Sequence, residues 1–93
     1  MAVATVAAPR ELAALTSALS DLVPDLADQL LAARPGRVYR EALAMLEKPL
    51  LLHALHLTGG SQLRAARLLG VNRNTLRKRC RELGLPTPKI SQA

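Results

Sequence analysis

A chain of 93 residues can form one small domain, in the size range where a partner subunit often supplies extra buried surface. Apolar residues make up 49% of the sequence but include no Phe, no Trp and one Tyr, so the expected core is aliphatic and suits packed helices better than a β-sandwich or barrel. The single cysteine excludes an intramolecular disulfide, and no apolar run approaches the roughly 20 residues that a membrane span needs.

The net charge of +6 indicates a polyanionic partner, and the distribution of the charge indicates where that partner binds. Residues 1–36 hold two basic and four acidic side chains, and residues 37–60 hold three and two. Residues 61–83 hold seven basic side chains and one acidic one. The positive field therefore belongs to the last third of the chain.

The first 36 residues contain one amphipathic pattern that a proline interrupts. Apolar residues recur every three or four positions from Pro9, a suitable first-turn proline, at Leu12, Leu15, Leu19 and Leu22, which predicts a helix. After Pro24 a second apolar stripe covers 26–31, either as a short separate helix or as a kinked continuation. A turn is expected at 34–36, and residues 1–8 are expected to be a loose terminus.

Residues 37–58 form the next predicted helix, and its apolar face is unusually wide. The face consists of Val38, Ala42, Met45, Leu46, Leu50, Ala54 and Leu57, widened by Leu43, Leu51 and Leu55. So wide a stripe should contact more than one neighbour. Pro49 should kink this helix unless packing tolerates it, and two glycines at 59–60 should end it.

Two short helices follow, with Ser61 and Asn72 as N-caps and Gly70 as the turn between them. The second helix should run to about Leu83 and be followed by Gly84, a residue type that is common directly after the end of a helix. The inward face of the first is predicted as Leu63, Ala65, Ala66, Leu68 and Leu69. The residues that shape the pair are Ala66 at the crossing, Gly70 with positive φ, Val71 and Leu76 filling the gap, and Cys80 in the core. This is the pattern of a helix-turn-helix.

The outer face of the last predicted helix carries the main functional signal. Arg73, Arg77 and Arg81 recur at i, i+4 and i+8, flanked by Asn74, Lys78 and Arg79. Like charges at this spacing repel, so the row favours a helix that an anion neutralises, as in the major groove of DNA. A merely solvated basic face is the alternative.

Other chemistry has little support in the sequence. His53 and His56 share a helix flank without a third ligand, so we predict no metal and no cofactor. The hydroxyl groups of the C-terminal half have no evident His or Lys base, and we predict that the chain is not an enzyme.

The segment from Leu46 to Leu85 resembles the Fis-type DNA-binding domain of bacteria. That domain occurs as the nucleoid protein Fis and as the C-terminal module of NtrC-type enhancer-binding activators, and the NRNTLRK sequence at 72–78 is more similar to the activators, especially those of nitrogen regulation. The resemblance implies an all-α chain of four to five helices whose N-terminal helices form an intertwined dimer bundle. It implies a disordered 1–8, a helical dimerisation region 9–60, a helix-turn-helix unit 61–85 and a flexible tail 86–93.

The resemblance also implies roles for individual residues. Base reading falls to Asn72 and Arg73, and phosphate binding to Gln62, Arg64, Thr75, Arg77 and Lys78. The implied dimer interface includes Leu12, Leu15, Leu19, Leu46 and Leu50. Three positions depart from the family pattern: Ser61 stands in place of Asn, Gly59 in place of a residue that is often basic, and Cys80 in place of Leu. We expect the changes at Ser61 and Gly59 to weaken DNA binding. The recombinase-stimulating hairpin of Fis has no counterpart in 1–9, so that activity is not carried over.

We therefore predict a dimeric, sequence-specific transcription regulator in the bacterial cytoplasm, at the nucleoid, that binds double-stranded DNA and no membrane. It is either the DNA-binding end of an NtrC-type activator or a small Fis-like regulator. Candidate partners besides a second copy are other domains of a longer activator and RNA polymerase components. The alternatives are a nucleoid-structuring, DNA-bending protein with weak sequence preference, and a dimerisation or adaptor module that binds another protein.

Overall fold

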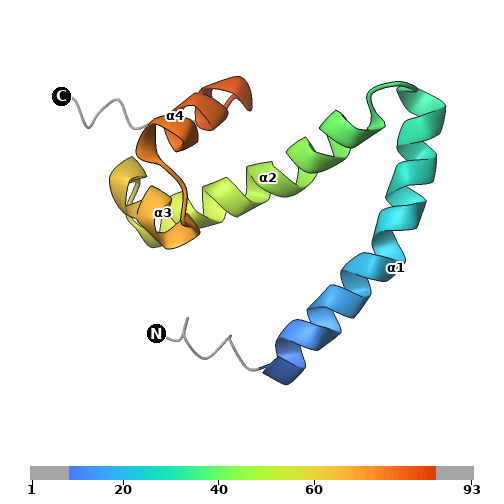
Figure 1. Cartoon of the computed structure of the whole chain (residues 1–93), viewed down its shortest axis with the longest axis horizontal. Helices are drawn as coiled ribbons and strands as arrows, with labels where there is room; N and C mark the ends of the chain where they lie inside the picture. Colours follow the sequence, from blue (N-terminus) through green and yellow to red (C-terminus); the bar gives the residue numbers. More distant parts are fainter. Residues whose placement is uncertain (1–8, 86–93) are drawn as a thin grey trace. The chain divides into compact units, whose positions relative to one another are not determined.

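The computed structural model describes residues 9–85, and all of their regular structure is helical (Figure 1). The helices are α1 (Pro9–Ala33), α2 (Val38–Leu57), α3 (Gln62–Leu69) and α4 (Arg73–Glu82). The predicted all-α class is confirmed, with four helices in this range. The segments predicted as a disordered terminus and a flexible tail, 1–8 and 86–93, lie outside it. The chain divides into two compact units, and the division falls in the sequence between Ala42 and Leu43.

In the first unit, α1 begins at Pro9, as predicted, and continues without a break through Pro24. Of the two alternatives left open by the sequence, the continued helix is the correct one. Proline cannot donate a hydrogen bond to the carbonyl four residues earlier, that of Ser20. Both residues are exposed, so water can take the place of the missing donor.

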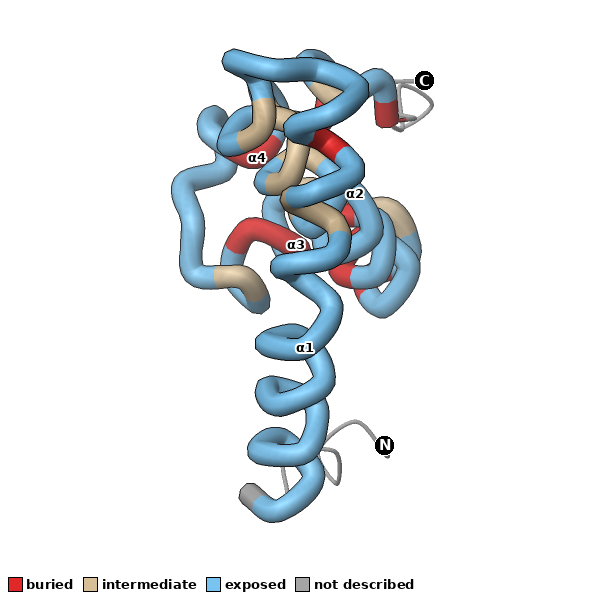
Figure 2. The backbone as a smooth tube through the Cα atoms, turned by 90° about the vertical axis from the view of Figure 1, so that its right-hand side faces the viewer, coloured by how far each residue is buried: buried red, intermediate tan, exposed pale blue. Residues whose placement is uncertain are grey.

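Most of α1 is exposed in the single chain, as the pale tube of Figure 2 shows. Leu30 is its one buried side chain among those described. The large apolar side chains of its stripe are 49–62% exposed: Leu12, Leu15, Leu19, Leu22, Val23 and Leu31. The amphipathic pattern therefore forms a helix whose apolar face is left largely uncovered by the first unit itself.

The turn between α1 and α2 falls where the sequence predicts it. The backbone N–H of Arg37 donates to the carbonyl of Arg34 at 3.0 Å, and Gly36 adopts a φ of +87°. Glu41, in the first turn of α2, forms ion pairs with Arg34 at 3.0 Å and with Arg37 at 3.6 Å. An acidic side chain in this position also interacts favourably with the helix dipole.

The second unit has its own hydrophobic core, which α2, α3 and α4 build together. It consists of Leu51, Ala54, Leu55, Ala65, Ala66, Leu76, Cys80 and Leu85, with Leu69 and Leu83 packed against it. Ala65 and Ala66 are almost completely buried, and so small a side chain lets two helices approach closely. Leu76 and Cys80 of α4 are buried in the same core, with 1% and 0% of their surface exposed.

Three apolar residues predicted inside this motif are exposed instead: Leu63 by 41%, Leu68 by 61% and Val71 by 43%. At about 100° per residue, Leu63 and Leu68 lie more than 100° around α3 from the centre of the inward group, which consists of the buried Ala65 and Ala66 and the partly buried Leu69. A helix of eight residues can bury only one such group. Leu76, in contrast, is only 1% exposed.

The wide apolar face of α2 splits into two edges. One edge, with Leu51, Ala54 and Leu55, belongs to the core of the second unit. The other edge, with Leu46, Leu50 and Leu57, remains 45–55% exposed. α2 is a single helical element across Pro49.

Replacing Gly70 with alanine should destabilise the second unit by about 1 kcal/mol, because its φ of +79° is unfavourable for a residue with a Cβ. A Cβ there would meet no atom within 4 Å, so the expected cost is one of backbone conformation alone. The free energy of unfolding from urea titration measures it. Gly70→Asn, which tolerates this conformation better, should cost less; equal stability of all three proteins would contradict the prediction.

Candidate nucleic-acid interface

Ser61 fixes the beginning of α3, as predicted. Its hydroxyl accepts a hydrogen bond from the backbone N–H of Arg64 at 3.1 Å, which satisfies one of the free donors of the first turn. Just before it, the buried Thr58 hydroxyl lies 3.0–3.2 Å from the carbonyls of Ala54, Leu55 and Ser61. These contacts tie the end of α2 to the start of α3. This role of Thr58 was not predicted from the sequence.

Asn72 caps α4 with its side-chain oxygen, which accepts from the backbone N–H of Asn74 at 2.7 Å. This contact leaves the two N–H donors of the same amide unused by the cap. Between the helices, the backbone N–H of Gly70 donates to the carbonyl of Ala66 at 2.8 Å. The end of α3, the turn and the start of α4 are thus held by hydrogen bonds within residues 61–74.

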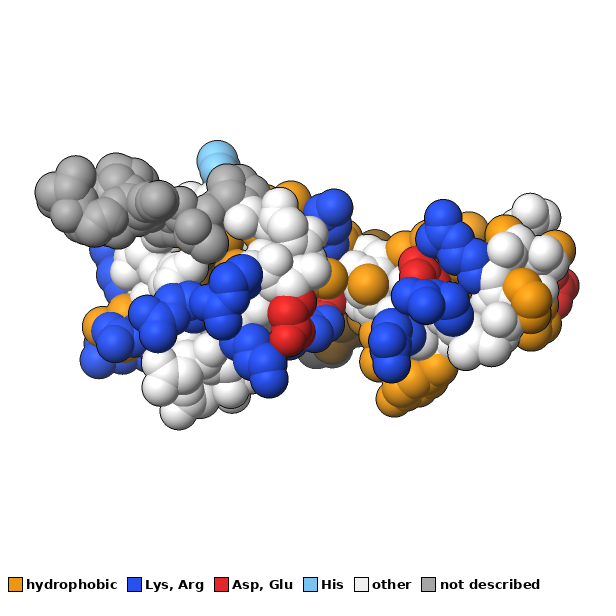
Figure 3. Space-filling view, turned by 90° about the horizontal axis from the view of Figure 1, so that it is seen from above, with side chains coloured by type: hydrophobic (Ala, Val, Ile, Leu, Met, Phe, Trp, Pro, Cys, Tyr) orange, Lys and Arg blue, Asp and Glu red, His pale blue; other side chains and the backbone are white. Residues whose placement is uncertain are grey.

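The basic row of α4 lies on the surface. Arg73, Arg77, Lys78 and Arg81 are all exposed, and none of them forms an ion pair within residues 9–85. Arg64 and Arg67 on α3 are also exposed. In Figure 3 basic side chains form a continuous row over the part of the molecule built by α3 and α4. Thr75 is exposed and Gln62 half-buried at the respective helix starts.

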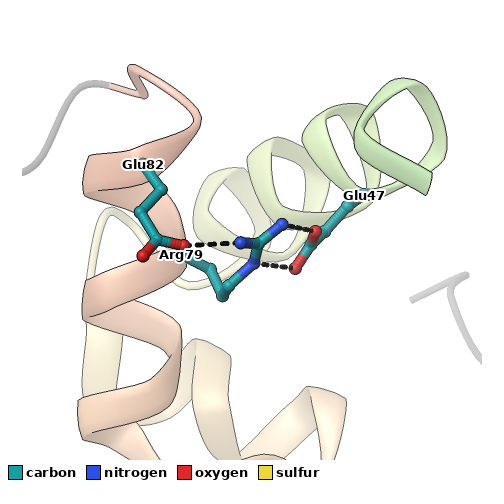
Figure 4. A network of polar contacts seen from close by, with 3 residues as sticks. All are labelled: Glu47, Arg79 and Glu82. Carbon is teal, nitrogen blue, oxygen red and sulfur yellow. Dashed lines mark hydrogen bonds and ion pairs between the residues drawn. The ribbon is translucent and has the colours of Figure 1, made fainter. Parts of the chain in front are cut away.

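Arg79 does not share this free surface, although the sequence analysis placed it beside the row. Its guanidinium donates to both carboxylate oxygens of Glu47 on α2, through Nε at 2.8 Å and through a second, shorter contact from Nη2. Its Nη1 donates to Glu82 at 2.5 Å (Figure 4). Arg79 is therefore shared between two acids and joins α4 to α2.

The electrostatics of this network follow from its geometry. The hydrogen bonds from Arg79 hold the pKa of Glu47 below its ordinary value, against the opposing effect of partial burial. The hydrogen bonds to Glu47 and Glu82 raise the pKa of Arg79. Burial, and secondly the charge of Glu47, raise the pKa of the Cys80 thiol. Cys80 is fully buried, which agrees with its predicted role as a core residue.

Glu47 is the contributor to this site that the sequence analysis missed. A signal was present, because Glu47 precedes the buried Leu51 by four residues and therefore shares its face of the helix. An acidic side chain on the helix face that is directed to the core is expected to have a basic partner, because an unpaired charge is costly to bury. The sequence alone did not show that Arg79, 32 positions away, would provide it.

Other sites find no support in the part of the chain that is described. Residues 9–85 bring no three His, Cys, Asp or Glu side chains together as a metal site, and His53 and His56 are both exposed. Within the same range no helix has both the length and the apolar character needed to span a membrane.

Two capped helices crossing through alanines, a positive-φ glycine turn and an exposed basic second helix define a helix-turn-helix of the DNA-binding class. Residues 42–84 match the family model for a bacterial regulatory protein of the Fis family. This segment, slightly less than half of the chain, is therefore similar to the DNA-binding domains of the Fis family, which are not enzymes.

Known proteins with similar sequences agree with this assignment. The DNA-binding transcriptional regulator NtrC of Rhizobium meliloti is 50% identical over 62 residues, which are 67% of this chain and 13% of the relative. The DNA-binding protein Fis of Mannheimia haemolytica is 40% identical over 57 residues, 61% of this chain and 58% of the relative. A putative Fis-like DNA-binding protein of Neisseria meningitidis is 47% identical over 51 residues, 55% and 65% of the two chains.

The match therefore spans about an eighth of that NtrC regulator and less than two thirds of the two Fis proteins. No solved structure gives a significant match to the chain.

Acid should weaken the fold through Glu47. Because its pKa is lowered in the folded protein, this carboxylate contributes stability above the unfolded pKa of about 4.3, and the contribution is lost as the pH falls through the folded pKa. Glu47→Gln should lower the free energy of unfolding by about 1 kcal/mol at pH 7, since the pair is partly exposed. The difference from the parent should shrink below about pH 4.5.

Urea titrations at a series of pH values measure this difference. Glu11→Gln is the matched control, because it removes an acid that forms no ion pair within residues 9–85. A pH-independent gap between Glu47→Gln and the parent would contradict the assignment.

Proposed function

We propose that this chain is a dimeric, sequence-specific transcription regulator. The observation that carries the proposal is the row of exposed basic side chains on α4, which have no ion-pair partner in residues 9–85 and extend from the capped beginning of the helix. A free row of this kind is suited to the phosphates and base edges of a major groove.

In this proposal the start of α4 reads bases. Arg73 is the first residue of the helix and is exposed, and a guanidinium there can donate two hydrogen bonds to one guanine. Asn72 can use its amide donors on a neighbouring base while its oxygen retains the cap.

The remaining predicted contacts are with phosphate. Arg77 and Lys78 follow Arg73 by one turn of α4, and Thr75 lies between them and the helix start. Gln62 and Arg64 occupy the first turn of α3, where backbone N–H groups and the helix dipole also favour anions. These contacts fix the register of the protein on the duplex without reading sequence.

We further propose that residues 9–60 form the dimerisation region and residues 61–85 the DNA-binding unit. The support is apolar surface: Leu12, Leu15, Leu19, Leu46 and Leu50 are all 50–60% exposed in the single chain. Burying the exposed part of each should contribute about 1 kcal/mol. An intertwined bundle of two chains would cover these residues and present two copies of α4 to one duplex.

The similarity to an NtrC regulator favours a role as the DNA-binding part of an NtrC-type activator, in nitrogen regulation; a small Fis-like regulator is the other form of the same proposal. In the first case other domains of the activator and RNA polymerase components are further partners. The bacterial nucleoid, in the cytoplasm, is the expected location.

The test of this function is selection from a pool of randomised duplexes at about 150 mM salt, where nonspecific phosphate binding is weakened. A regulator should enrich a two-fold symmetric motif and prefer it roughly 10³-fold over random DNA. Enrichment of flexible or A/T-rich DNA alone would replace this proposal with a nucleoid-structuring role.

The two kinds of DNA contact predict different mutant behaviour. Arg73→Ala should cost about 1–3 kcal/mol on the selected site and relax base preference, because a base contact is lost. Lys78→Ala should weaken binding to all sequences alike and reduce the salt slope by about one unit. Titrations on selected and scrambled duplexes at several salt concentrations measure both, and equal behaviour of the two variants would contradict the assigned roles.

A charge in the proposed interface should separate the subunits. Leu19→Asp or Leu50→Asp should give a monomer with much weaker DNA binding, because a carboxylate would be buried in an apolar contact. Sedimentation velocity measures the oligomeric state. Leu68→Asp is the control, since Leu68 is also exposed (61%, against 50% for Leu19 and Leu50) but lies on α3, and it should leave the dimer intact. A dimer that survives both interface substitutions would place the interface elsewhere.

A further inference from the structure

We infer that Glu47 is a positioning residue for DNA recognition, which sets the orientation of α4 by holding Arg79. The inference builds on the DNA-binding role of the domain and on the proposed base reading by α4. It concerns a residue of α2 that carries a negative charge and belongs to none of the proposed DNA contacts.

The contact is suited to fixing an orientation. Two nitrogens of one guanidinium, Nε and Nη2, donate to the two oxygens of one carboxylate, so both planar groups are held in a single arrangement (Figure 4). Within residues 9–85, no other side-chain hydrogen bond or ion pair joins α4 to α2 or α3.

The apolar core brings α4 close to its neighbours but constrains its rotation less specifically. The α4 side chains buried in it are Leu76 and Cys80, and they pack against alanines and leucines. The hydrophobic effect that buries these side chains is non-directional, although their close packing does limit how far the helix can move. A small rotation of this ten-residue helix would keep most of the same apolar area buried, but it would move Arg73 relative to a base edge.

Arg79 also lies on a different side of α4 from the free basic row. It is two residues from Arg77 and two from Arg81, which places it about 160° around the helix from each. A helix with Arg77 and Arg81 on DNA therefore directs Arg79 toward its own protein. There it meets Glu47, and Glu82 on the same helix takes its remaining donor group.

Charge alone predicts the opposite effect of removing Glu47, which makes the inference testable. Loss of an acidic side chain from a protein of net charge +6 should raise its affinity for every duplex. If Glu47 positions α4, Glu47→Gln should instead weaken binding to the selected site by roughly fivefold. Its affinity for a scrambled duplex should be unchanged or higher.

Glu82→Gln is the matched control. It removes the same charge and a contact to the same arginine, but leaves α4 attached to α2. It should bind the selected site at least as tightly as the parent. Arg79→Lys keeps the positive charge but cannot form the two-nitrogen contact, and it should show the same loss as Glu47→Gln.

The experiment compares the four proteins on selected and scrambled duplexes, at a temperature where urea titration shows each to be fully folded. A Glu47→Gln protein that binds the selected site as tightly as the parent, or a Glu82→Gln protein that loses as much, would overturn the inference. Amide hydrogen exchange of α4 in the free proteins is a second measurement, and faster exchange is expected in Glu47→Gln but not in Glu82→Gln.

The two measurements also separate this inference from the proposed function. A parent protein without any preferred duplex would refute sequence-specific regulation. In that case the exchange rates of α4 alone decide the role of Glu47, and equal rates in the two Gln variants would overturn it.

Discussion

The second unit depends on the close approach of two short helices through alanine. Ala65 and Ala66 present almost no side chain to hold α3 away from its neighbours, so Leu76 and Cys80 of α4 can fill the space beside them. A bulkier pair would force the helices apart. The turn must then reverse the chain within a few residues, which requires the positive φ of Gly70. The geometry of the motif follows from these small residues.

This packing stabilises a helix that its own charges destabilise. Arg73, Arg77 and Arg81 repel along α4, at a few tenths of a kcal/mol for each pair. The cap at Asn72, worth about 1 kcal/mol, and the apolar contacts of Leu76 and Cys80 oppose that repulsion. A polyanion bound along the row would remove it. The repulsion is thus a local electrostatic cost at the surface that we propose contacts DNA.

Local signals in the sequence predicted most of this motif, because caps and glycines act within a few residues. Ser61, Asn72 and Gly70 behave as predicted, and so does the start of α1 at Pro9. Features set by tertiary contacts were predicted less well. Leu63 and Leu68 face away from the core because a helix of eight residues can bury only one side, and Ala65 and Ala66 occupy that side.

The contact between Glu47 and Arg79 joins positions 32 residues apart, so no local pattern could identify the pair. To identify the pair, one must know which faces of α2 and α4 lie against each other. The local sequence also could not decide whether the helix ends at Pro24. The answer depends on the surroundings of Ser20 and Pro24, both of which are exposed.

The two units differ in what stabilises them. The second has a core of eight buried residues, whereas α1 buries only Leu30 among its described side chains. A 25-residue helix containing proline is marginal on propensity alone, since an interior proline costs about 3 kcal/mol. The exposed leucine stripe of α1 is the available source of compensation, and it acts only if another surface covers it. In the proposed dimer, therefore, ordering of α1 and association of the subunits are one coupled process, and the concentration of dimer sets the stability of the first unit.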